Sequence, residues 1–150
     1  MLRSKRWTDD DGNASLEFIT TGMILLLPLV YLVLVMAAVQ AGALAVEGAA
    51  RQAVRVFVQS ATVDEAQARA ERAIQFGLKD YGLDAKDATV SVNCAPKPTD
   101  CLTRLGTVTV SIAVSVRLPL APSVINVDLP LSVPLKATAT ERVSRFWSDR

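Results

Sequence analysis

Apolar residues form one long run near the N-terminus, and shorter alternating runs follow in the second half of the chain. No charged side chain occurs between Phe18 and Val46. As a helix rising about 1.5 Å per residue, this stretch of about 29 residues would measure about 43 Å. A bilayer core needs only about 20 residues. The pattern therefore predicts one membrane-spanning helix that continues beyond the bilayer.

Past Val46 the helical pattern becomes amphipathic. Glu47 and Arg51 stand one turn apart, and alanines and valines at 49, 50, 53, 54 and 58 form an apolar side that we expect to pack on the following domain. A single helix of about 40 residues accounts for both halves. One face carries a stripe of small residues, a pattern that permits close packing between membrane helices. The stripe consists of Ala38, Gly42, Ala45 and Ala49.

A second helix is predicted from Thr62 to about Asp80. Thr62 and Glu65 fit a capping box, in which Thr62 accepts from the amide of Glu65 and the Glu65 side chain reaches back to the amide of Thr62. Apolar residues then recur at helical spacing, and Gly82 is suited to the C-terminal stop.

From Ala88 the apolar period changes to two. Alternation predicts strands over residues 88–94, 107–118 and from Leu135 towards Val143, each with one buried face. The stretch from Leu120 to Pro134 contains Pro122, Pro130 and Pro134, so we expect loop or edge strand there. The predicted fold class is α+β: a long N-terminal transmembrane helix entering a small domain, where one further helix packs on a three- to four-stranded antiparallel sheet.

Composition narrows the function classes. The formal net charge is +1 and no run of like charges lies outside the predicted span, so we expect no nucleic-acid partner. Histidine is absent and there are 2 cysteines, too few for a structural zinc site. Ser111 and Ser115 lie on a strand's polar side without a histidine base. We expect no enzymatic activity, metal, cofactor or small-molecule substrate.

Cys94 and Cys101 bracket a short segment between the first two predicted strands. This is not the CxxC spacing of a redox motif, so the spacing favours a structural disulfide that fixes a hairpin loop. Closure of such a ring is worth about 2.5 kcal/mol in the loop-entropy model. Two free thiols in a reducing compartment are the alternative.

The flanks of the span bear on its orientation. Arg3, Lys5 and Arg6 precede it and favour a cytoplasmic N-terminus, although Arg51 and Arg55 follow closely behind it. The same basic residues resemble the start of a secretory signal peptide, but the apolar run is about twice as long as such a signal's core. A disulfide would require the domain to lie in an oxidising compartment.

Glu17 stands at the mouth of the span and has two interpretations. In the first, Asn13 caps the helix and Glu17 lies in its first turn, favoured by the helix dipole and by water. In the second, the carboxylate enters the membrane edge and is neutralised by a charge on another chain. The spacing alone fits both.

The segment from Gly12 through Glu17 and Phe18 into the apolar helix resembles the signal of type IV pilins, which a prepilin peptidase cuts after the glycine. The layout of the whole chain is similar to TadE-like pseudopilins, or minor pilins, of tight-adherence (Flp-type) pilus systems. Those proteins have a short charged leader, one span, an alanine-rich helix like residues 47–55, and a small strand-rich domain often carrying a cysteine pair. The specific part of the likeness covers residues 12–55.

The resemblance implies residues 1–12 as a cytoplasmic leader, 13–58 as the transmembrane helix with its extension, and 59–150 as an extracytoplasmic domain. Cleavage would fall between Gly12 and Asn13, and Glu17 would pair with the α-amino group at Asn13 of a neighbouring subunit. Expected partners are the lipid bilayer of a bacterial cytoplasmic membrane, other pilin subunits, the pilus assembly machinery and a prepilin peptidase. Asn13 departs from the usual methylated phenylalanine, and Asp9 to Asp11 place negative charge beside the cut. The alternative is an uncleaved single-pass protein whose outer domain binds a ligand or acts as a scaffold.

Overall fold

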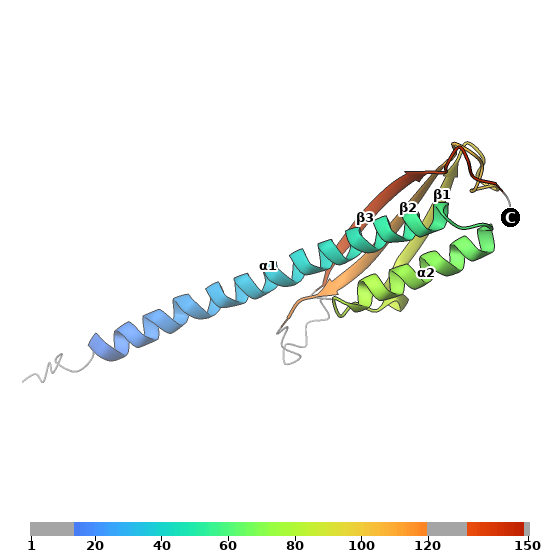
Figure 1. The fold of residues 1–150 in the computed structure, drawn as a ribbon. Helices are drawn as coiled ribbons and strands as arrows, with labels where there is room; N and C mark the ends of the chain where they lie inside the picture. Colours follow the sequence, from blue (N-terminus) through green and yellow to red (C-terminus); the bar gives the residue numbers. More distant parts are fainter. Residues whose placement is uncertain (1–13, 120–131, 149–150) are drawn as a thin grey trace, which may run out of the picture. The chain divides into compact units, whose positions relative to one another are not determined.

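The computed structural model describes residues 14–119 and 132–148. The fold is α+β, with a long N-terminal apolar helix, a second helix and a three-stranded antiparallel sheet (Figure 1). The chain divides into two compact units, one ending at Met36 and one beginning at Ala37. The first helix ends at Val58, so the second unit includes the second half of that helix.

Helix α1 spans Ala14–Val58 and remains helical through Pro28. Its length of 45 residues agrees with the predicted single helix of about 40. The amphipathic second half of α1 carries the expected ion pair between Glu47 and Arg51. Both side chains of this pair are exposed, so it stabilises the helix by only about 0.3–0.5 kcal/mol.

Helix α2 spans Val63–Lys79, and its start confirms half of the predicted capping box. The amide of Glu65 donates to Thr62 Oγ1 at 3.3 Å, whereas the Glu65 carboxylate accepts from the amide of Ala61 at 3.1 Å, not from that of Thr62. The helix ends in a Schellman motif: the amide of Leu83 donates to Leu78 O, and that of Gly82 to Lys79 O. Gly82 has φ +72°, which explains glycine at this stop.

The sheet has strand order β1-β2-β3, with β1 at Thr89–Ala95, β2 at Thr107–Arg117 and β3 at Ser132–Arg142. A short 3₁₀ turn, η1 (Ala85–Asp87), precedes β1. β3 begins earlier than the alternation predicted and includes Pro134. This is possible because β3 is an edge strand, so a missing amide donor need not interrupt the sheet. Pro122 and Pro130 lie outside the described residues.

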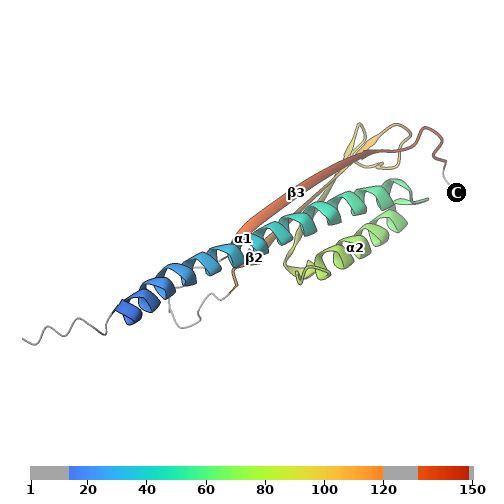
Figure 2. The same ribbon diagram turned by 60° about the vertical axis from the view of Figure 1, so that its left-hand side comes forward.

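The core of the second unit lies between the sheet and the two helices, which share one face of the sheet (Figures 1 and 2). β2 carries the alternation most clearly, with each inward side chain buried. The largest fully buried side chains include Phe57, Leu78, Leu102 and Ile112. On the opposite face, hydroxyl groups pair across strands: Thr109 with Thr140 and Ser111 with Thr138, both at 2.9 Å.

The strand predicted over residues 88–94 is β1. The prediction that one of its faces is buried is wrong. Val90 and Val92 point to the same side as buried residues of β2, yet they are 42% and 40% exposed. The reason is that β1 lies at the sheet edge, and α2 covers it incompletely.

Candidate membrane anchor and assembly surfaces

The first half of α1 presents apolar side chains without any covering from the described chain. Every residue from Ser15 to Leu34 is exposed, including the leucines, isoleucines and methionine of this segment. Twenty residues of helix rise about 30 Å, the thickness of a bilayer's hydrocarbon core. Among the described residues, this is the one helix long and apolar enough to cross a membrane. The segment fits a single membrane span near the N-terminus.

Glu17 lies in the first turn of α1 and is exposed. The ion pairs of the described residues join Glu47 to Arg51 and Glu65 to Arg69, so none involves Glu17. Apolar residues Leu16 and Phe18 flank it, at 62% and 80% exposure. A carboxylate here stands at the end of an uncharged segment, where partial transfer into lipid is costly unless an opposite charge accompanies it. Gly12 and Asn13, the predicted cleavage site, lie outside the described residues.

The stripe of small residues packs inside the chain's own domain. Gly42, Ala45 and Ala49 are buried and Ala38 is half-buried. A Cβ atom at Gly42 would lie 2.6 Å from Val116 Cγ2 and 2.9 Å from Leu135 Cδ1, so glycine lets the sheet approach the helix. In this conformation Gly42, Ala45 and Ala49 are not available to a neighbouring helix, because the sheet and α2 already cover them.

A second close approach joins α1 to α2. A Cβ atom at Gly77 would lie 3.1 Å from Ala49 Cβ and 3.3 Å from Ala49 Cα. The two helices therefore meet through small residues, as helices do where backbones come close. Nothing in the sequence indicated a partner for Gly77. Its contact depends on which helix lies opposite, and helical spacing alone does not carry that information.

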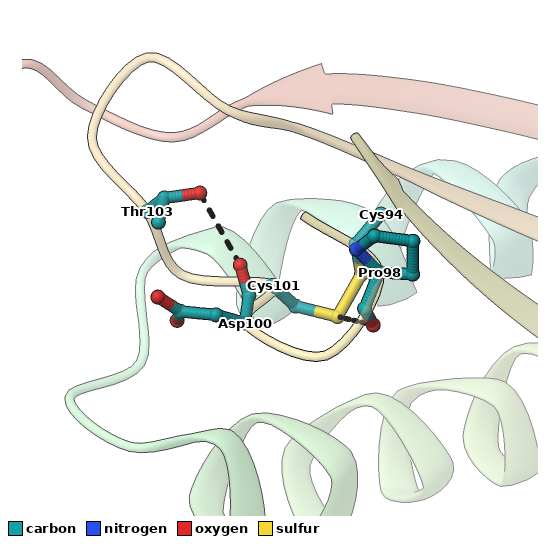
Figure 3. The surroundings of a disulfide bond; sticks show 5 residues. All are labelled: Cys94, Pro98, Asp100, Cys101 and Thr103. Carbon is teal, nitrogen blue, oxygen red and sulfur yellow. Dashed lines mark hydrogen bonds between the residues drawn. A yellow bond between two sulfur atoms is a disulfide. The ribbon is translucent and has the colours of Figure 1, made fainter. Parts of the chain in front are cut away.

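The predicted disulfide between Cys94 and Cys101 is present, with Cα atoms 5.1 Å apart (Figure 3). It joins the end of β1 to the loop that leads into β2. In the same loop Thr103 Oγ1 donates to Asp100 O at 3.2 Å. Cys101 and Cys94 are partly buried against the core, so the bond ties the loop to the domain. Both cysteines are consumed by this bond, and no free cysteine occurs among the described residues.

The described residues, 14–119 and 132–148, lack two features that often mark a metal or ligand site. No three His, Cys, Asp or Glu side chains gather there as a metal site would require. No buried side-chain nitrogen or oxygen there lacks a hydrogen-bond partner. What the described residues do present is an apolar helix long enough to cross a membrane. The absence of enzymatic activity stays a prediction.

No protein-family model, curated protein sequence or solved structure matches the chain.

Proposed function

We propose that this protein is a non-enzymatic, membrane-anchored pseudopilin or minor pilin that takes part in assembling a tight-adherence (Flp-type) pilus. Its N-terminus lies in the cytoplasm and its domain on the far side of the bacterial cytoplasmic membrane. The observation that carries the proposal is the exposed carboxylate of Glu17 at the start of the exposed apolar first half of α1. The disulfide supports the orientation, because such bonds persist in oxidising compartments.

The proposed role of Glu17 is to set the register between subunits. After cleavage behind Gly12, the α-amino group of Asn13 would pair with Glu17 of a neighbouring subunit inside the membrane edge. In a low-dielectric setting, displacing one helix along the other leaves both charges unpaired, at a cost of several kcal/mol. The paired register is thereby selected over the displaced ones. Helix contacts for this assembly come from residues 15–34, since the chain's own domain covers Gly42, Ala45 and Ala49.

Glu17→Gln tests the charge pairing, because glutamine keeps the size of the side chain and removes its charge. We expect normal membrane insertion and at least a tenfold loss of the protein from the sheared pilus fraction, measured by immunoblot. Glu47→Gln is the matched control: it removes a carboxylate from the same helix, one that is already paired with Arg51. Equal pilus incorporation of the Glu17 and Glu47 variants would rule out charge pairing by Glu17.

Mass spectrometry of the membrane form tests cleavage separately. The proposal expects a mature chain that begins at Asn13. A chain beginning at Met1 or Leu2 supports the alternative, an uncleaved single-pass protein whose outer domain binds or scaffolds.

A further inference from the structure

The free edge of β1 combines open backbone groups with exposed apolar side chains. β1 pairs only with β2 in the described chain. In register, Val90 lies beside Ile112 and Val92 beside Val110. The two β2 residues are fully buried, whereas the two valines of β1 remain about two-fifths exposed. The face of the sheet that packs on the helices is therefore fully covered at β2 but only partly covered at β1.

A groove lies between β1 and α2, with a volume of about 370 Å³. Val90, Val92 and Val110 form its sheet wall, and Phe57, Ala70 and Ile74 contribute from the helices. An additional strand beside β1 would project alternate side chains into this space, because successive side chains point to opposite faces of a sheet. The groove therefore has the position required by the inward side chains of a fourth strand.

The two edges of the sheet differ in how they resist strand addition. β3 carries Pro134, Lys136, Glu141 and Arg142, and proline and charge are the usual means of blocking edge pairing. β1 has neither proline nor charge along its seven residues, Thr89–Ala95. Of the two edges, only β1 is suited to accept another strand.

The rim of the groove indicates the charge of its occupant. Glu71, Gln67 and Gln75 line the groove from α2. Glu71 is exposed and takes part in neither of the ion pairs found among the described residues. A basic side chain on the incoming segment would complement Glu71, while an acidic one would be repelled.

We propose that the β1 edge and this groove bind an extended segment of another polypeptide, which adds to the sheet as a fourth strand. The segment alternates small apolar side chains, directed into the groove, with polar ones, and it carries a lysine or arginine near Glu71. Main-chain hydrogen bonds to β1 hold it, and the groove selects its side chains. This inference does not depend on the proposed pilus function.

The test uses the full chain in lipid nanodiscs and an acetylated nine-residue peptide that alternates valine with threonine and ends in lysine. We expect the peptide to slow hydrogen exchange of the β1 amides at least tenfold and to leave the β3 amides unchanged. The same peptide ending in glutamate should bind at least threefold more weakly by fluorescence anisotropy. Glu71→Gln should abolish that difference between the peptides.

Val92→Lys should weaken peptide binding at least tenfold, because it places a charge in the groove. Ala139→Lys, at the β3 position that pairs with Val110 as Val92 does from β1, should leave binding unchanged. Retained exchange protection of β2 shows that the variants fold, and the exchange result with the unmodified chain stands without them. The proposal is overturned if millimolar peptide leaves β1 exchange unaltered or protects β3. Protection of β1 that rises with protein concentration in the absence of peptide would assign the edge to a second copy, which also overturns it.

Discussion

Gly42 and Gly48 lie within two turns of each other on α1, and their surroundings are opposite. A Cβ atom at Gly42 would meet Val116 and Leu135 below 3.0 Å, whereas one at Gly48 would have nothing within 4 Å. Glycine lowers helix stability by about 0.5–1 kcal/mol relative to alanine, so each position carries that cost. Only at Gly42 is the cost offset by a close approach between helix and sheet.

We therefore expect opposite effects from the same substitution. Gly42→Ala should destabilise the domain by about 1–2 kcal/mol, because overpacking outweighs the gain in helix propensity. Gly48→Ala should stabilise it by about 0.5–1 kcal/mol. Urea denaturation of the full chain in detergent micelles, followed by tryptophan fluorescence, measures both. Effects of the same sign would show that the contact at Gly42 relaxes freely.

At the scale of elements, the hairpin between β1 and β2 is held by its strand pairing and also by the disulfide. β1 is the shortest strand and has one exposed edge, and its inward valines are only partly covered. The bond between Cys94 and Cys101 holds the end of this strand to the loop beside Leu102, which is buried in the core. The bond therefore compensates for the weak coverage of β1.

Replacing both cysteines with serine, Cys94→Ser with Cys101→Ser, should lower the free energy of unfolding by about 2.5 kcal/mol. Hydrogen exchange at β1 should rise more than at β3, since the bond anchors only β1. Reduction of the unmodified protein with dithiothreitol is the control and should reproduce the loss. An unchanged unfolding midpoint in both experiments would contradict a structural role for the bond.

At the scale of the whole molecule, the segment after β3 closes the second unit. Trp147 Nε1 donates to Ser60 O at 3.0 Å, which joins the C-terminal segment to the turn between α1 and α2. Arg104 Nε donates to Trp147 O at 2.8 Å, and the amide of Val143 donates to Gly106 O at 2.8 Å. Three segments far apart in the sequence are thereby tied together at one end of the core.

Trp147→Phe should cost about 1–2 kcal/mol, because it removes the hydrogen bond to Ser60 and part of a half-buried ring. Phe146→Leu is the neighbouring control. Its side chain is 85% exposed, so the change should stay within about 0.5 kcal/mol. Far-UV circular dichroism during urea denaturation measures both variants without relying on the tryptophan. If the Trp147 and Phe146 variants are equally stable, Trp147 does not help to hold the C-terminal segment to the domain.

Local signals in the sequence determined the elements. The charge-free run and the amphipathic continuation predicted α1, the Thr62 cap and Gly82 predicted the ends of α2, and strict alternation predicted β2. These succeed because helix periodicity, capping and strand alternation act between residues close in the chain. The disulfide was also predictable, because the chain's two cysteines lie seven residues apart and bracket one predicted loop.

Only the tertiary structure decided which surfaces meet. It turned the small-residue stripe of α1 toward the chain's own sheet and toward Gly77 of α2. It also left the inward face of β1 open, although its alternation is as regular as that of β2. The physical reason is that a periodic pattern states which side of an element is apolar. What covers that side depends on segments distant in the sequence, whose arrangement follows from packing the whole core.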